Sequence, residues 1–195
     1  MGSPAAGSRA GILLGFVPLI VYGLLAGPSV QSRIVALGAA TLVTVVAGFP
    51  DLKKGRILTW ASLVLFGGLL VATVGLAQAG ILIWSGVLIN AVLAAVAFGS
   101  ILAGVPFTLQ YAREMVDPAH HDNPVFLRVN IQMTGVWGSV FTVNALLNYL
   151  ALVLPGPAGQ AAALLTYVFL ATGIVFTLRY PVHIRKKYAH ASPGG

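Results

Sequence analysis

Residues 81–105 read ILIWSGVLINAVLAAVAFGSILAGV and contain no charged side chain. An α-helix rises about 1.5 Å per residue, so about 20 apolar residues cross the hydrocarbon core of a bilayer. The length of this stretch therefore predicts a transmembrane helix. The whole chain agrees, because 58% of its 195 residues are hydrophobic and 8% are charged, whereas a soluble domain carries about 25% charged residues. Too few polar side chains are present to cover a water-soluble fold of this size.

Outward from this stretch, charges, prolines and glycines bound five further apolar runs. Together they predict an all-α polytopic membrane protein, a single domain with six transmembrane helices. The expected spans are residues 11–27, 34–49, 57–76, 81–105, 129–154 and 161–178. Residues 106–128 are expected to form a cytoplasmic loop, and residues 179–195 a basic cytoplasmic tail.

The basic residues predict the orientation of these spans. With both termini in the cytoplasm, Arg33 is the one basic residue outside, and ten of the eleven lie inside. Such a bias in short loops is the usual determinant of membrane orientation. The ten are Arg9, Lys53, Lys54, Arg56, Arg113, Arg128, Arg179, Arg185, Lys186 and Lys187. The net charge of +7 then has a membrane explanation, and we expect no binding to nucleic acid.

Several function classes are disfavoured by what the spans lack. None contains Asp, Glu, Lys, Arg or His, although pumps and ion-coupled carriers place an ionisable group at membrane depth. The chain has no cysteine, which excludes disulfides, thiolate metal sites and cysteine nucleophiles. No glycine-rich phosphate loop or nucleophile-elbow pattern is present. We therefore expect no catalytic residue and no cofactor.

The fifth expected span carries a stripe of uncharged polar side chains. Steps of three and four residues place them on one helix face. An amide in hydrocarbon needs a partner, so this face is expected to point at other helices or at a hydrated cavity, with Asn90 of the fourth span as a candidate partner. The indole N–H of Trp137 likewise needs an acceptor. The polar intramembrane stripe consists of Asn90, Asn130, Thr134, Trp137, Asn144 and Asn148.

Two expected spans carry small residues every four positions, which lets helix backbones approach closely. They are Ala36, Ala40, Thr44 and Gly48 in the second span, and Ala91, Ala95, Gly99 and Ala103 in the fourth. We expect these small residues to serve helix packing and both helices to be central in the bundle. Each helix also ends in a Gly-x-Pro sequence, at residues 48–50 and 104–106, where proline ends or kinks it.

The cytoplasmic face offers two weaker sites. A face for lipid headgroups or a partner protein would use Arg113, Glu114, Arg128, Arg179, Arg185, Lys186 and Lys187. Glu114 and Arg113 are adjacent and cannot pair well with each other on a helix, so both are expected to pair elsewhere, across the bundle or with Arg128. His120, His121 and Asp122 are weak metal candidates, because consecutive loop residues rarely converge on one ion. The favoured interpretation of this segment is a solvated loop with turns at its two prolines.

Three motifs resemble those of the bacterial intracellular septation protein A family. They are VPLIVYGLL at residues 17–25, LFGGLL at residues 65–70, and a series with Trp137-Gly138, Phe141, Asn144 and Asn148-Tyr149. The Gly138-Ser139 pair beside Trp137 and the His120-His121-Asp122 loop are departures that suggest a divergent member. The resemblance implies a bacterial inner-membrane protein tied to cell-envelope or division processes. It supplies no catalytic residue.

Three functions are open on these grounds. The first is a non-enzymatic protein that supports envelope or septation machinery through helix packing and its basic face, alone, as a homo-oligomer or as a subunit of a larger membrane complex. The second is a small carrier or channel for a lipidic or neutral solute, lined by Asn90, Asn144 and Asn148. The third, an interfacial enzyme acting on lipid through His120, His121 and Asp122, ranks lowest. Membrane lipids are expected partners in every case.

Overall fold

The computed structural model describes the backbone of residues 4–189 and the side chains of residues 15–114 and 116–184. Within that range every regular element is a helix. The long helices are α1 (Pro4–Leu25), α2 (Val30–Val46), α4 (Ile57–Leu70), α5 (Ser85–Leu102), α7 (Pro124–Val153) and α8 (Gly156–Ala189). The short ones are α3 (Phe49–Lys53), the π-helix η1 (Val71–Gly75), α6 (Phe107–Ala112), and the 3-10 helices η2 (Ala79–Trp84), η3 (Arg113–Met115) and η4 (Pro118–His120).

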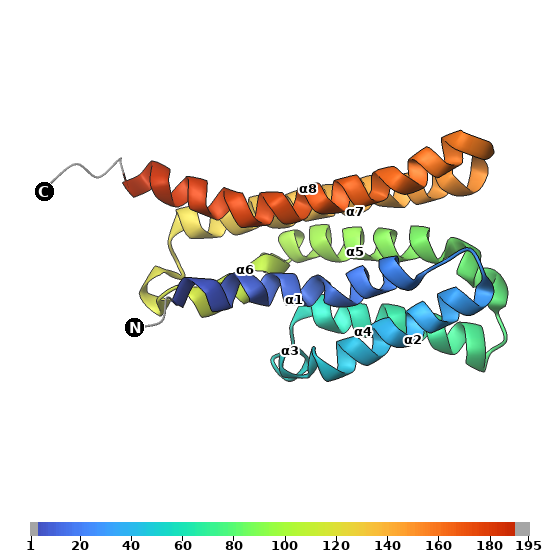
Figure 1. Ribbon diagram of the computed structural model, residues 1–195. Coiled ribbons are helices and arrows are strands. Elements are labelled where there is room, and N and C mark those ends of the chain that lie inside the picture. Colours follow the sequence, from blue (N-terminus) through green and yellow to red (C-terminus); the bar gives the residue numbers. More distant parts are fainter. Residues whose placement is uncertain (1–3, 190–195) are drawn as a thin grey trace, which may run out of the picture.

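The long helices alternate in direction along one bundle (Figure 1). α1 begins and α8 ends at the same end, which we call the terminal end, and α3 and α6 lie toward it. The opposite, distal end is built from residues 26–29, residues 76–84 and residues 154–155. Packing runs from α8 to α7, from α7 to α5, and from α1 through α2 to α4.

Four helices in the described part of the chain are long and apolar enough to cross a membrane. They are Ile57–Gly75, Ala79–Leu102, Pro124–Val153 and Gly156–Ile184, and two shorter apolar helices span Gly15–Leu25 and Val30–Val46. Large apolar side chains such as Leu42, Val64 and Leu164 point outward. An outward apolar surface suits lipid and not water, so the predicted all-α class is confirmed and the helices indicate a membrane protein.

Helix capping explains why some boundaries differ from the predicted ones. α7 begins at Pro124, five residues before the expected span, because the Asn123 side chain accepts a hydrogen bond from Val125 N–H (2.8 Å) and Pro124 fits the first helical turn. α8 continues to Ala189, so much of the expected tail is helical. The fourth expected span is a 3-10 helix followed by an α-helix that ends at Leu102.

Only one of the two small-residue faces packs inside the bundle. On α2, Ala36, Ala40 and Thr44 are fully buried, as predicted. On α5, Ala91, Ala95, Gly99 and Ala103 are exposed, so that prediction is wrong. The buried face of α5 carries a mixture of large and small residues instead: Ser85, Ile89, Asn90, Leu93, Ala94, Ala97 and Ser100.

The space that lets α5 and α7 approach each other comes from one glycine on each helix. A Cβ at Gly138 of α7 would lie 2.8 Å from the Phe98 ring of α5. A Cβ at Gly86 of α5 would collide with the Asn148 side chain of α7. The close approach therefore depends on these two single glycines and not on the stripe of alanines.

The two Gly-x-Pro sequences each begin a new short helix. Pro50 lies in the first turn of α3, and Pro106 caps the start of α6. Gly55 after α3 and Gly104 before α6 have φ of +68° and +74°, which glycine adopts without strain. These turns return the chain to the bundle at its terminal end.

Candidate functional site

The segment that was expected to be a solvated loop is partly a buried helix. Side chains of α6 at Phe107, Thr108, Leu109 and Tyr111 are at most 2% exposed. Pro106 starts this helix, and Phe107 N–H donates to the hydroxyl of Ser100 (3.1 Å). The first third of the predicted 106–128 loop is thus part of the core, because its apolar residues fill the terminal end of the bundle.

α6 supplies partners for the first half of the polar stripe. The Thr108 hydroxyl lies 3.0 Å from the carbonyl oxygen of Asn130 and 2.9 Å from the Thr134 hydroxyl. Asn130 donates from its side-chain nitrogen to the Phe126 carbonyl, and its buried Oδ1 has no hydrogen-bond donor among the described residues. Asn130 and Thr134 are buried, as the stripe predicted. Here the polar side chains join α6 to α7.

An ion network at the terminal end joins the α3–α4 turn to η3. Arg56 is 5% exposed, and its guanidinium nitrogens lie 3.1 Å from Asp51 Oδ1 and 2.6 Å from Glu114 Oε2. Lys54 Nζ lies 2.8 Å from Glu114 Oε1. The Arg56 guanidinium also sits 4.1 Å from the centre of the Tyr111 ring. Glu114 therefore pairs across the bundle, one of the two arrangements expected for it, and not with Arg128.

The network changes the acidity of its members. Hydrogen bonds from Lys54 and then Arg56 hold the pKa of Glu114 below 4.5. Burial by itself would lower the pKa of Arg56, but the hydrogen bond to Glu114 and the charge of Asp51 raise it above its ordinary value. Both shifts favour the charged forms, so the network holds its charges at neutral pH.

His121 stabilises its own loop. Its Nε2 lies 2.9 Å from the carbonyl oxygens of Arg113 and Val116, and because carbonyls only accept, this nitrogen carries the hydrogen. The ring stacks on Phe126 with centroids 6.1 Å apart. His120 and Asp122 are exposed, and in the described residues no three His, Asp or Glu side chains gather as a metal site would require.

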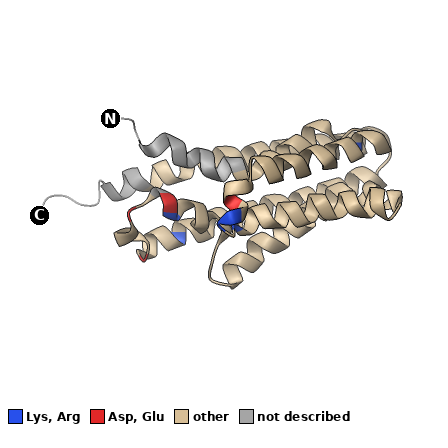
Figure 2. Cartoon of the chain, turned by 90° about the horizontal axis from the view of Figure 1, so that it is seen from below, with Lys and Arg blue, Asp and Glu red and all other residues tan. Residues whose placement is uncertain are grey.

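Only part of the predicted basic face lies among the residues whose side chains are described. Arg113, Arg128 and Arg179 are exposed at the terminal end, and Glu114 belongs to the ion network. The side chains of Arg185, Lys186 and Lys187 lie outside the described residues. Figure 2 shows most of the coloured charged residues in the half of the bundle nearer the termini, with one basic position near the opposite end. Arg33 is the basic residue that lines a cavity at the distal end.

Trp137 lies in the middle of the stripe and packs as a core residue. It is fully buried, stacks on Phe16 of α1 with centroids 4.0 Å apart, and meets Gly173 of α8. Its indole N–H donates to the Thr177 hydroxyl (2.9 Å). The acceptor that the indole N–H was expected to need is therefore present. Trp137 also divides the stripe into two parts that have different surroundings.

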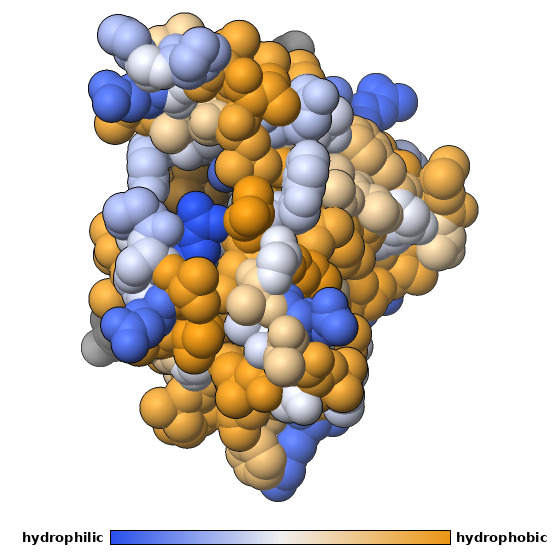
Figure 3. Space-filling model, turned by 90° about the vertical axis from the view of Figure 1, so that its right-hand side faces the viewer, coloured by the Kyte–Doolittle hydropathy of each residue, from blue (hydrophilic) through white to orange (hydrophobic). Residues whose placement is uncertain are grey.

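The second part of the stripe faces a cavity of about 460 Å³ at the distal end. Its walls come from α1, the 26–29 connection, α2, α5, α7 and α8. Figure 3 views the molecule from this end and shows its surface hollowed, with hydrophilic atoms near the recess. Asn90, Asn144 and Asn148 all line the cavity, so the three amides named from the sequence do meet at one place.

The amides do not bond across the helices as expected for Asn90. Asn90 donates to the Gly86 carbonyl (2.9 Å) and Asn148 to the Asn144 carbonyl (2.8 Å), each four residues earlier on its own helix. The reason is geometric, since an amide can always reach the carbonyl one turn back. Asn144 is 4% exposed, and among described residues its Oδ1 finds no hydrogen-bond donor.

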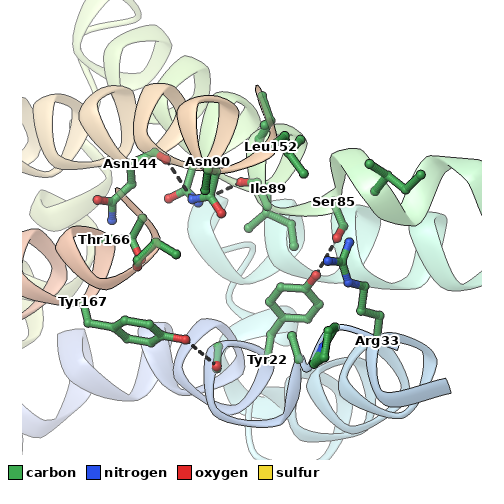
Figure 4. Close-up of a pocket in the computed structure, with 18 of the residues that line it drawn as sticks. Tyr22, Arg33, Ser85, Ile89, Asn90, Asn144, Leu152, Thr166 and Tyr167 are labelled. Atoms are coloured by element: carbon green, nitrogen blue, oxygen red, sulfur yellow. Dashed lines mark hydrogen bonds between the residues drawn. The ribbon is translucent and has the colours of Figure 1, made fainter. Parts of the chain in front are cut away.

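The opposite wall carries phenols. Tyr22 of α1 donates to the Ser85 hydroxyl (2.7 Å), and Tyr167 of α8 donates to the Gly23 carbonyl (3.1 Å). The second of these bonds ties α8 to α1 across the cavity. Figure 4 shows Asn90 and Asn144 at one side of the pocket, Tyr22 and Tyr167 at the other, and Arg33 beside Tyr22 and Ser85.

Arg33 is the one charged residue in the lining. Its guanidinium donates to the carbonyl oxygens of Gly27 and Leu82. The rest of the lining is apolar or small and includes Leu19, Ile89 and Leu170. This combination suits a ligand that has an apolar part and a hydrogen-bonding part.

Sequence reasoning missed Tyr22, Ser85, Tyr167 and Arg56 as site or network residues, and treated Arg33 only as an orientation signal. For Arg33 a signal existed, because it is isolated from every carboxylate in the chain. For the phenols and Ser85 no local pattern distinguishes them from interfacial or packing residues.

Comparison with protein-family models, curated proteins and solved structures finds no match to this chain. The resemblance to the septation family therefore stays a prediction.

Proposed function

We propose that this protein is a small integral membrane carrier that binds a lipidic solute in the distal cavity. The observation that carries the proposal is the side chain of Asn144, a buried amide whose oxygen has no protein donor within the described residues and which lines an open cavity. An unsatisfied buried acceptor costs about 1–3 kcal/mol. A ligand that donates a hydrogen bond there would remove that cost.

The proposal includes six membrane crossings with both termini in the cytoplasm. Support comes from the alternating helix directions, which bring the start of α1 and the end of α8 to one end (Figure 1). Further support comes from the positive charges near that end. In this orientation the cavity opens toward the outer half of the bilayer, and Arg33 lies near the outer interface.

The arrangement of the amides favours a binding role over a purely structural one. Amides that hold helices together bond from one helix to the next. Here Asn90 and Asn148 bond within their own helices, although Asn148 lies against Gly86 of the neighbouring helix. The Asn148 oxygen packs against Gly86, and the Asn144 oxygen has no donor among the described residues, so Asn144 offers the clearest acceptor for a bound molecule.

The lining favours a lipidic solute. α1 and α8 flank the cavity. Among the described residues that line it, Tyr167 provides the hydrogen bond that joins these two helices. A molecule with an alkyl chain could lie between them with its polar part near the amides. The expected spans hold no ionisable group, which favours passive movement of such a solute over coupling to protons.

A supporting role in envelope or septation machinery, and membership of a larger complex, stay predictions that rest on the sequence resemblance. Exposed Arg113, Arg128 and Arg179 offer a basic face for a partner or for lipid headgroups. Crosslinking in cells tests this role, and a clean sample that has no partner would argue against it.

The carrier proposal is tested by filling the cavity. Ala163 lines it on α8, whereas Ala171 of the same helix is exposed and lies outside the lining. Ala163→Phe should reduce co-purifying lipid counted by native mass spectrometry and slow lipid movement in liposomes by about tenfold. Ala171→Phe is the matched control and should leave both unchanged. Equal lipid counts and equal rates in the two variants would contradict the proposal.

A further inference from the structure

The distal cavity contains a cation whose charge is not balanced by the protein. Arg33 is half-buried, and the cavity lining holds no Asp or Glu. The carboxylates Asp51 and Glu114 belong to the ion network at the terminal end, and Asp117 and Asp122 lie in the same end's loop. Within the described part of the chain, no carboxylate therefore lies beside Arg33 or across the cavity from it.

The hydrogen bonds of Arg33 leave part of its guanidinium available. A guanidinium has five N–H donors and no acceptor. Arg33 gives one bond from Nε to the Gly27 carbonyl and one from a terminal nitrogen to the Leu82 carbonyl. These two bonds hold the group at the cavity wall, and three N–H groups remain for another acceptor.

The surroundings strengthen an electrostatic interaction at this place. The guanidinium is partly removed from water, which reduces screening and favours a charge-assisted hydrogen bond to an anion. Tyr22 and Ser85 lie beside it and are bonded to each other, so they fix this wall of the pocket (Figure 4).

A second, independent observation points to a ligand in the same cavity. Asn144 is more than nine-tenths buried, lines the pocket and has an acceptor oxygen without a partner among described residues. Figure 4 places Asn144 at the side of the pocket away from Arg33. The site thus offers a cation at one place and a hydrogen-bond acceptor at another.

We propose that the distal cavity selects an anionic amphiphile, with a phosphate or carboxylate on Arg33 and a hydroxyl or N–H group on Asn144. An acidic phospholipid with a hydroxylated headgroup has both groups. This inference rests on the proposed carrier function and adds the charge of the solute. The shared chemistry is an anion on a guanidinium, and the experiment below distinguishes a lipid headgroup from free phosphate.

The test measures binding to the purified full-length protein in detergent. The probes are dioctanoyl phosphatidylglycerol, dioctanoyl phosphatidylcholine and inorganic phosphate, each followed by isothermal titration calorimetry. We expect the acidic lipid to bind about tenfold more tightly than the zwitterionic one, because its phosphate carries a net negative charge and its headgroup offers a hydroxyl, whereas the choline cation of the zwitterionic lipid is repelled by Arg33 and offers no donor to Asn144. Inorganic phosphate that displaces the acidic lipid would support a free anion as the natural ligand, and phosphate that does not would support the lipid headgroup.

Variants at Arg33 separate charge from folding. Arg33→Gln should weaken binding of the acidic lipid about tenfold and change binding of the zwitterionic lipid much less, so that the preference between the two lipids is lost. Arg33→Lys keeps the charge and should retain most of the preference, whereas Lys53→Gln, at an exposed lysine outside the cavity lining and outside the basic face, should change nothing. Unfolding midpoints measured on the same samples show whether each variant is folded. If Arg33→Gln is unfolded, the lipid preferences of the wild type and of Arg33→Lys decide whether the charge of Arg33 selects the acidic lipid.

The outcomes distinguish the two proposals. If both lipids bind equally and Ala163→Phe abolishes both, the carrier proposal stands and the charge inference is wrong. If neither lipid binds above the level of Ala163→Phe, the cavity is not a lipid site and both proposals fail. A preference for the acidic lipid that persists in a folded Arg33→Gln variant would also overturn the inference.

Discussion

The terminal and distal ends of this bundle contain similar polar residues in different surroundings. Each end holds one buried amide oxygen without a partner among the described residues, on Asn130 and on Asn144, but of the two only Asn144 lines the distal cavity. At the terminal end Arg56 is enclosed by Asp51, Glu114 and the Tyr111 ring, and Thr108 joins α6 to α7. At the distal end Arg33 bonds only to backbone carbonyls among described residues, and Asn144 keeps an unpartnered oxygen beside a cavity. Polar groups that satisfy one another stabilise a fold, and polar groups left over beside a cavity are available to a ligand.

The largest expected effect is on stability at the terminal end. Arg56→Met leaves Asp51 and Glu114 without their shared partner, and breaking a buried ion pair is strongly destabilising. Because Glu114 is half exposed, we expect a loss of about 2–3 kcal/mol, below the range for a fully buried pair. Chemical unfolding in detergent measures it. Arg113→Met, an exposed arginine of the same end, should change the free energy of unfolding by less than about 0.5 kcal/mol.

A smaller effect is expected where α6 meets α7. Thr108→Val keeps the shape and removes the hydroxyl between Asn130 and Thr134. We expect a loss of about 1 kcal/mol, because Thr134 can turn to a carbonyl of its own helix. The same unfolding experiment measures it, with the exposed Thr172→Val on α8 as control. An unchanged midpoint for Thr108→Val would show that α6 is not held by this residue.

The ion network also predicts a dependence of stability on pH. The pKa of Glu114 is lowered in the folded state, so its contribution is fully present above about pH 4.5 and is lost as the pH falls through the lower folded value. Glu114→Gln should therefore be less stable than wild type at pH 7, and the difference should shrink in acid. Asp122→Asn, an exposed carboxylate of the same end, should keep the wild-type profile. A Glu114→Gln difference that is constant down to pH 3 would contradict this role.

The smallest effect on stability is expected at the cavity. Asn144→Leu removes an acceptor that has no protein partner, so the free energy of unfolding should change by less than about 0.5 kcal/mol or increase. Lipid binding should nevertheless fall. A large loss of stability would instead show that Asn144 is structural, and the contrast between the two ends would then disappear.

Much of the architecture could be predicted from the sequence because hydropathy and helix periodicity are local properties. The polar face of α7 followed from steps of three and four residues, and the need of the Trp137 indole N–H for an acceptor followed from its place inside an apolar span. The buried α6 could not be predicted, because its burial depends on space left by distant helices. The packing face of α5 was assigned wrongly, since the glycines that permit the close approach, Gly86 on α5 and Gly138 on α7, lie outside the predicted stripe.

The site was predictable only in part for the same reason. Asn90, Asn144 and Asn148 were named from their position inside apolar runs. Whether an amide side chain bonds to a neighbouring helix or to its own helix depends on the separation of the helices. No local sequence pattern encodes that separation. Tyr22 and Tyr167 come from the first and last helices, and the fold brings them to opposite sides of one cavity.

The most direct test of the central claim, that the distal cavity holds a lipid, is photolabelling in liposomes with an acidic phospholipid that carries a diazirine on its acyl chain. The account predicts adducts on lining residues such as Leu19 and Leu170, and their loss in Ala163→Phe. Labels on outward-facing Leu164 and Val168 should persist in both proteins, since these residues contact bulk lipid. Labels confined to the outward residues, with the lining unlabelled in wild type, would contradict it.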